Sequence, residues 1–189
     1  MDQESKEKGF DGIERGSNGQ KSGRIGCELV LRLLALVLNL ASAVILGVGK
    51  ETKIVSVKLV PTLPAVDVSS TAKATYLSAF VYNISANAIA CGYVAVSTLI
   101  LMVTRGKSKP LAAVLLVGDL VMVALLFSGT GAAGAIGLMG FQGNKHVMWN
   151  KVCNVFGKFC HTVASSLVIS LLASVVFMVL VVFDAMRVS

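Results

Sequence analysis

The chain has 189 residues, of which 55% are hydrophobic and only 14% are charged, and its formal net charge is +7. Soluble domains contain about 25% charged residues, so this composition excludes an ordinary soluble domain. The Lys and Arg residues flank apolar segments and form no basic stripe with interleaved aromatic residues, which argues against nucleic-acid binding. The composition therefore indicates an integral membrane protein, and the length suits one bundle with short tails.

The N-terminal segment, residues 1–28, is predicted to be a disordered cytosolic tail. Residues 1–26 contain five Lys or Arg, five Asp or Glu, and six Gly. Such a segment has too little apolar surface to bury, so it is not expected to fold. It also lacks the pattern of a cleavable signal peptide, and we therefore expect the first apolar span to act as the insertion signal.

Four apolar runs follow, and each is long enough to cross about 30 Å of hydrocarbon as an α-helix. We expect transmembrane helices at residues 29–49, 76–103, 111–139 and 162–184. The connections are predicted to be loops at 50–75, 104–110 and 140–161, with a short C-terminus at 185–189. Alternating residues within 53–60 are a weak signal for a short strand in the first loop. The predicted fold class is an all-α membrane protein, a four-transmembrane-helix bundle with a disordered tail.

The distribution of positive charge predicts the orientation of the bundle. Four spans place both termini on one side, and that side holds nine Lys and Arg residues against seven on the other. The short turn between the second and third spans weighs most, because the positive-inside rule acts on short loops. This turn contains Arg105, Lys107 and Lys109. We therefore expect the turn and both termini to be cytosolic, and the other two loops to be extracellular.

Two of the predicted spans carry a charged residue about one turn or more from their ends, Arg32 in the first and Asp119 in the third. A charge within hydrocarbon is costly and requires a partner. A bidentate pair would offset part of both desolvation costs, so we expect Arg32 and Asp119 to form an intramembrane ion pair. Alternatively, Arg32 reaches the headgroups or pairs with Glu28 on its own helix. The sequence disfavours a proton relay through Asp119, because it indicates no second buried acid.

Polar residues recur at helical spacing in three spans. This pattern predicts hydrogen bonds between helices, because lipid offers no partner; the alternative is that these residues line a pore. The residues are Arg32, Asn39 and Ser42 in the first span, Asn83, Asn87 and Cys91 in the second, and Thr162, Ser166, Ser170 and Ser174 in the fourth.

The third span ends in a segment rich in Gly and Ala. Small residues spaced four apart let two helix backbones approach closely, either within one chain or between two protomers. The pairs are Gly129 with Ala133 and Gly131 with Ala135.

The third loop contains Cys153 and Cys160. In an oxidising compartment these residues can form a disulfide, and otherwise they are two free thiols. Together with His146 and His161 they form a weaker candidate for a Zn²⁺ site. Trp149 is expected to anchor the loop at the membrane interface.

The sequence contains no motif for catalysis or for a cofactor. It has no phosphate-binding glycine loop after a strand, no nucleophile elbow and no paired carboxylates, so we expect neither an enzyme nor a bound cofactor or metal. Asn83-Ile84-Ser85 matches a glycosylation sequon, but it lies within the second span, where use is not expected. Cys27, at the start of the first span, is either an unmodified interface residue or a palmitoylation site.

Several of these features together resemble the plant Casparian strip membrane domain proteins, and more closely their CASP-like relatives of class 1. The resemblance extends from about Glu28 to Arg187. It is carried by Arg32, Phe80-Val81-Tyr82-Asn83, Gly118-Asp119, the Gly/Ala-rich end of the third span, and Gly143-Asn144-Lys145-His146-Val147-Met148-Trp149 running on to Cys153 and Phe159-Cys160. The first loop, Val57–Asp67, departs from the distinctive first loop of the founding members.

The resemblance implies a MARVEL-like bundle in the plasma membrane, with cytosolic termini, that forms homodimers, heterodimers or larger assemblies. Arg32 and Asp119 match the intramembrane charges of the family, and Cys153 and Cys160 match the cysteines of its second extracellular loop. The founding members form an immobile membrane platform that directs lignin deposition in the cell wall.

We therefore predict a non-catalytic scaffold that self-associates laterally, organises membrane domains and recruits partners that modify the cell wall. The expected partners are further copies of the chain, related family members, membrane lipid and extracellular wall-modifying enzymes, with no nucleic acid. The alternative is a channel or transporter subunit for a small solute or ion. In that case Asn39, Asn87, Ser166 and Asp119 would line the path.

Overall fold

The computed structural model describes residues 3–57, 66–104, 109–143 and 151–188. Within these ranges four long helices and one β-hairpin follow one another along the chain. The elements are α1 (Gln3–Val48), β1 (Lys50–Val57), β2 (Val66–Lys73), the 3-10 turn η1 (Ala74–Tyr76), α2 (Ser78–Thr104), α3 (Lys109–Gln142) and α4 (Gly157–Val188). The prediction of a four-helix membrane bundle is confirmed.

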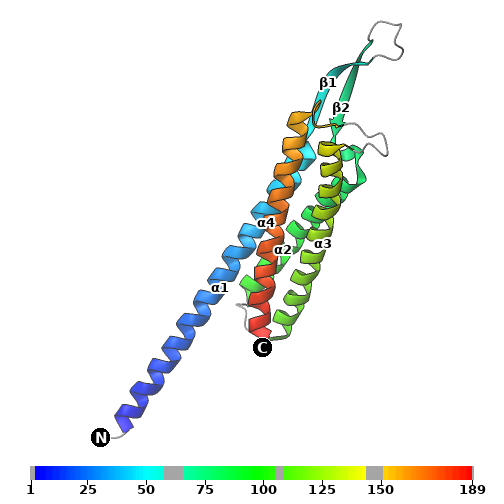
Figure 1. The fold of residues 1–189 in the computed structure, drawn as a ribbon. Helices are drawn as coiled ribbons and strands as arrows, with labels where there is room; N and C mark the ends of the chain where they lie inside the picture. The colour runs from blue at the N-terminus through cyan, green and yellow to red at the C-terminus, as the bar shows by residue number, and fades with distance from the viewer. Residues whose placement is uncertain (1–2, 58–65, 105–108, 144–150, 189) are drawn as a thin grey trace.

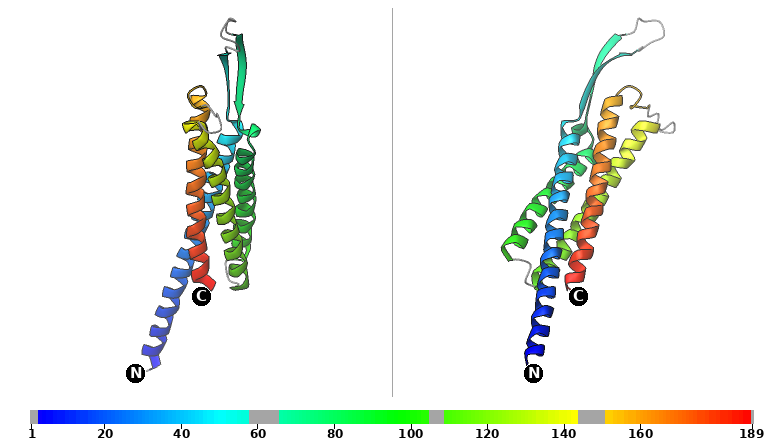
Figure 2. Two further views of the ribbon diagram at one scale, coloured as in Figure 1. Left: turned by 45° about the vertical axis from the view of Figure 1, so that its right-hand side comes forward. Right: turned by 90° about the vertical axis from the view of Figure 1, so that its left-hand side faces the viewer.

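The four helices pack side by side in a closed ring. Each helix contacts the next along the chain, and α4 closes the ring by packing against α1. Figure 1 shows both termini at one end of the bundle and the β1–β2 hairpin at the opposite end, and the two further views in Figure 2 agree. We call these the terminal end and the hairpin end.

The helices are apolar enough, over enough length, to cross a membrane. The candidate spans are Gly26–Val48, Ser78–Thr104, Pro110–Gln142 and Gly157–Val188. Large apolar side chains such as Val37, Leu99 and Val117 are exposed on the outside of the bundle. Exposed apolar side chains along whole helices suit lipid as the surrounding medium.

The N-terminal segment differs from its prediction as a disordered tail. From Gln3 it forms one continuous helix with the first span, and this helix projects beyond the terminal end of the bundle (Figure 1). Nucleation is the costly step in helix formation, and here the apolar span supplies the nucleus. The segment also contains no proline to stop propagation toward the N-terminus.

The first loop contains more regular structure than its weak strand signal indicated. Strands β1 and β2 pair antiparallel, with Lys50 opposite Lys73 and Val57 opposite Val66. The hydroxyls of Thr52 and Thr71 lie 3.0 Å apart across the two strands. The hairpin rises directly from the end of α1, since the Ala74 amide donates to the Gly49 carbonyl at 3.5 Å.

Candidate functional site: a buried charge cluster

One face of α1 carries the polar side chains that meet the other helices. The buried residues on this face recur every three or four positions. They are Glu28, Arg32, Ala35, Asn39, Ser42 and Leu46. Arg32 has an exposed fraction of 0%. The side chain therefore does not extend to the headgroups, and the bundle itself must satisfy its charge.

Arg32 is the centre of a cluster formed by all four helices. Its Nη1 and Nη2 donate to Oδ1 and Oδ2 of Asp119 at 3.3 and 3.1 Å, which is a bidentate pair between α1 and α3. Nη2 also donates to Asp184 Oδ2 on α4 at 3.2 Å, and Nη1 donates to Ser97 Oγ on α2 at 2.9 Å. The remaining nitrogen, Nε, donates to Glu28 Oε1 at 3.4 Å. Each guanidinium nitrogen thus has an acceptor.

The structure therefore brings Arg32 and Asp119 together, and it also includes the alternative partner Glu28. It contradicts the expectation that no second buried acid exists, because Asp184 is completely buried. The predicted fourth span ends at residue 184, which places Asp184 at its boundary, whereas α4 continues to Val188. The sequence did contain a signal for Asp184, since it lies five helical turns after Ser166 and therefore on the same buried face of α4.

A second guanidinium contributes to the cluster from the terminal end. Arg187 Nη1 donates to Glu28 Oε2 at 3.0 Å and lies 4.0 Å from Asp184 Oδ1. Its side chain is 22% exposed, so it faces the edge of the bundle. The cluster thus combines three carboxylates with two guanidinium groups, which joins α1, α3 and α4 at one level of the membrane. Groups of this kind are costly to bury singly and are tolerated when paired.

Two further polar layers lie between the charge cluster and the hairpin end. Ser42 of α1 and Ser166 of α4 exchange hydrogen bonds, each hydroxyl donating to the other residue's carbonyl at 2.9–3.0 Å. Asn39 contributes less than expected to interhelical bonding, because its Nδ2 donates to Ala35 O on its own helix at 2.7 Å.

The second layer centres on Ser170 of α4. Its hydroxyl lies 3.1 Å from Asn87 Nδ2 of α2 and 3.0 Å from Thr130 Oγ1 of α3, so it links three helices. Asn87 Nδ2 also donates to Asn83 O at 2.9 Å. Among the described residues, four buried side-chain atoms have no hydrogen-bond partner, and they are Asn39 Oδ1, Asn83 Nδ2, Thr98 Oγ1 and Asp184 Oδ1.

The small residues at the end of α3 divide between two faces. Gly129 lies against α2, where an added Cβ would be 3.3 Å from Ala86 Cβ and 3.4 Å from Asn83 Cα. Ala133 is buried in the apolar cluster at the hairpin end. Gly131 and Ala135 are exposed on the outside of the bundle, and a Cβ at Gly131 would meet nothing within 4 Å. One small pair therefore serves packing within the chain, and the other remains on the lipid-facing surface.

Gly118 has a packing role that spacing alone did not indicate. An added Cβ there would lie 2.5 Å from Tyr93 Oη and 2.6 Å from Cε2. The Tyr93 hydroxyl donates to Leu115 O at 3.0 Å, so the aromatic ring is fixed across α3. Gly118 directly precedes Asp119, so this close approach of α2 and α3 lies next to the buried carboxylate.

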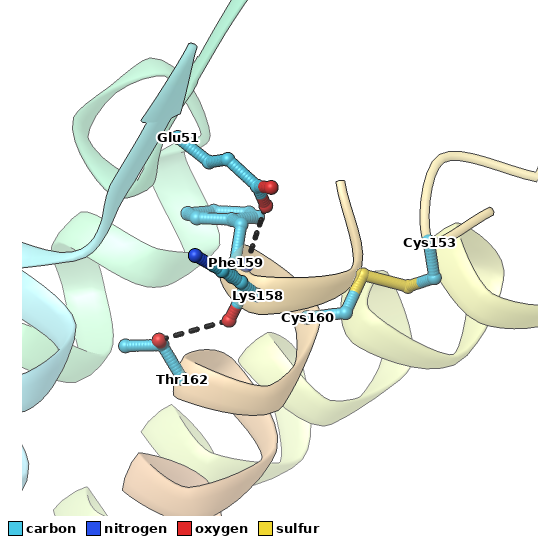
Figure 3. Close-up of a disulfide and its surroundings, with 6 residues drawn as sticks. All are labelled: Glu51, Cys153, Lys158, Phe159, Cys160 and Thr162. Carbon is cyan, nitrogen blue, oxygen red and sulfur yellow. Dashed lines mark hydrogen bonds between the residues drawn. A yellow bond between two sulfur atoms is a disulfide. The ribbon is translucent and has the colours of Figure 1, made fainter. Parts of the chain in front are cut away.

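The hairpin end is stabilised by a covalent bond and by a carboxylate. Cys153 and Cys160 form a disulfide with a Cα–Cα distance of 5.6 Å, and Cys160 belongs to the first turn of α4 (Figure 3). The predicted third loop therefore ends earlier than residue 161. Glu51 Oε2 of β1 accepts a hydrogen bond from the Phe159 amide at 2.9 Å, which caps α4 from the hairpin.

The other candidates from the sequence are the loop anchor Trp149, the metal site, and the cysteines outside the disulfide. Trp149 and His146 lie outside the described residues. Among the residues that are described, no group of three or more His, Cys, Asp or Glu side chains is placed to hold a metal ion. Cys27 is exposed, and Cys91 Sγ lies 3.8 Å from Leu36 O, which fits a packing residue between α2 and α1.

The fold and the site define a multi-pass membrane protein whose four apolar helices surround a paired charge cluster. A family model described as the Casparian strip membrane protein domain matches residues 21–176. The chain belongs to this family, and within it to the class 1 CASP-like proteins.

Similar proteins cover nearly the whole chain. CASP-like protein 1E2 of Arabidopsis lyrata subsp. lyrata is 66% identical over 93% of this chain and 92% of its own length. CASP-like protein 1E1 of Arabidopsis thaliana is 64% identical over 99% of both chains. CASP-like protein 1E1 of Populus trichocarpa is 54% identical over 94% of this chain and 91% of its own length. No solved structure matches the chain.

Proposed function

We propose that the protein is a non-catalytic scaffold of the plasma membrane that associates laterally with copies of itself and with related family members. The observation that carries the proposal is that the intramembrane charges bind one another. Arg32 donates to Asp119, Asp184, Glu28 and Ser97, so the cluster fixes the four helices relative to one another. A rigid bundle presents a constant outer surface, which lateral assembly requires.

The outward small-residue face of α3 supports the association step. Gly131 and Ala135 are exposed, as are Ser128 and Ala132 beside them. Close approach of two backbones through such residues is a common basis of helix association in lipid. Both termini lie at the end opposite the hairpin, and the positive charge of the short turn favours that end as cytosolic. In this orientation the hairpin and the disulfide face the cell wall, where they would recruit wall-modifying partners.

Fluorescence recovery after photobleaching of the tagged protein in a plant plasma membrane tests the scaffold. We expect slow and incomplete recovery for the wild type. Recovery should be faster for Gly131→Phe, because the larger side chain keeps α3 from approaching a neighbouring copy of the protein closely. Gly47→Phe is the matched control, since Gly47 is also exposed with nothing within 4 Å of an added Cβ but lies on α1. Free diffusion of the wild type, with a strictly monomeric mass in detergent, would contradict the proposal.

A path for a small solute or ion is the second candidate. The buried polar side chains run along the interior of the bundle, and four of their atoms have no hydrogen-bond partner among the described residues. Water molecules could join these atoms into a path. Flux into liposomes containing the purified protein tests this function, with Asp119→Asn as the variant. Flux that depends on Asp119 would favour conduction over the scaffold.

A further inference from the structure

An apolar cavity of about 310 Å³ lies at the hairpin end, away from the charge cluster. It is bounded by the last turns of α3, the first turns of α4, the start of α2 and the disulfide. Gly134, Gly137 and Gly140 form its α3 wall, and Val163 and Leu167 form part of its α4 wall. An added Cβ at Gly134 or Gly140 would meet nothing within 4 Å, so these glycines leave space that a side chain would occupy.

The cavity lies near the boundary of the membrane. Candidate span Pro110–Gln142 has 33 residues and span Gly157–Val188 has 32. At 1.5 Å per residue these helices are about 50 Å long, whereas the hydrocarbon core is about 30 Å thick. The helix ends that line the cavity therefore reach the headgroup region. The exposed side chains of Leu138 and Phe141, which also line it, extend the apolar surface beyond the hydrocarbon.

The surroundings of the cavity are basic. Lys151, Lys158 and His161 are exposed and directly adjoin lining residues along the chain. The sequence contains no Asp or Glu between Asp119 and Asp184. Glu51, the acid that reaches this region from β1, is already bonded to the Phe159 amide and lies 3.6 Å from Lys53 Nζ. An apolar interior with a basic border complements a molecule that has an apolar chain and an anionic head.

We propose that this cavity binds an anionic membrane phospholipid of the leaflet at the hairpin end, by inserting one of its acyl chains. The volume is about ten times the ~30 Å³ that one water molecule occupies in the liquid, which is room for roughly ten methylene groups. The acyl chain covers the exposed side chains of Leu138 and Phe141, and Lys151 and Lys158 attract the net negative charge of the headgroup. This attraction acts at the exposed surface, so it contributes the preference for an anionic over a zwitterionic lipid more than it contributes affinity. This binding is independent of lateral association.

Photocrosslinking locates the lipid. The purified full-length chain is placed in phosphatidylcholine vesicles that contain a small fraction of phosphatidylglycerol with a diazirine near the end of one acyl chain. After illumination, peptide mapping identifies the modified residues. We expect them to concentrate in 134–141 and 159–167. Crosslinks spread evenly over the outward faces of the four helices, as for ordinary surrounding lipid, would overturn the proposal.

Two variants separate the cavity from the general lipid surface. Gly134→Phe fills the cavity and should lower crosslinking in these segments about tenfold, because the burial of a few methylene groups is lost. Gly47→Phe, an equally unobstructed glycine of α1 outside the cavity, should leave it unchanged. Equal crosslinking in both variants would refute the site.

The contribution of the lipid headgroup is measured by comparing this crosslinking with that of phosphatidylcholine carrying the same diazirine. Lys151→Gln combined with Lys158→Gln should reduce the preference for phosphatidylglycerol and leave the phosphatidylcholine signal unchanged. An unaltered preference would refute the basic border. None of these readouts depends on recovery after photobleaching, so failure here and failure of the scaffold are distinguishable.

Discussion

Replacing Arg32 with methionine tests the charge cluster most directly. Methionine has a similar length and no charge, so the change leaves Glu28, Asp119 and Asp184 without the cation that they share. Removing one partner of a buried pair costs about 3–5 kcal/mol, because the remaining charge stays buried and uncompensated. Arg32 binds three carboxylates and is completely buried, so we expect a value toward the upper end of this range.

Asp119→Asn provides the comparison. The amide keeps an acceptor for Arg32, and Asp184 and Glu28 remain bonded to the same guanidinium. The expected loss is therefore smaller, about 1–3 kcal/mol. Arg187→Gln, at the 22% exposed edge of the cluster, should cost about 1 kcal/mol or less. The expected order of destabilisation is thus Arg32→Met, then Asp119→Asn, then Arg187→Gln.

Thermal unfolding of the three purified variants in one detergent measures this order, and the amount of each variant at the cell surface gives a second measure. A loss of several kcal/mol lowers the steady-state amount several-fold, because chaperones and proteases act on the unfolded fraction. Adding Asp119→Asn and Asp184→Asn to Arg32→Met should restore part of the stability, since it removes two of the uncompensated charges. An Arg32→Met protein with the stability of the wild type would refute the role assigned to the cluster.

Two further predictions concern packing and the disulfide. Gly118→Val should destabilise the bundle by about 1–3 kcal/mol in thermal unfolding, because its Cβ would lie 2.5–2.8 Å from the hydroxyl and ring of Tyr93. Tyr93→Ala in the same chain should relieve the clash. Gly92→Val is the control, since an added Cβ at Gly92 has nothing within 4 Å. Cys153→Ser should lower the free energy of unfolding by about 2–3 kcal/mol, because the disulfide no longer closes a short loop. The variant should also expose the Cys160 thiol to labelling. Labelling of both cysteines in the untreated wild type would contradict the disulfide.

The amino-acid sequence by itself determined that the chain forms four membrane helices. Long apolar runs and clustered charges leave few alternatives, because a backbone in lipid must satisfy its own hydrogen bonds. The sequence also indicated the main participants of the site. Arg32 and Asp119 stand out as charges inside apolar runs, and Ser166 and Ser170 stand out by their spacing.

Only the tertiary structure decided which partners these residues have. Asp184 lies at the edge of an apolar run, where the sequence cannot distinguish a solvated end from a buried one, and its burial depends on α4 packing against α1. The two small pairs of α3 look alike in sequence, but Gly129 contacts α2 whereas Gly131 faces outward. The physical reason is the same in both cases. Helical periodicity determines which residues share a face, whereas the packing of neighbouring helices determines what that face meets.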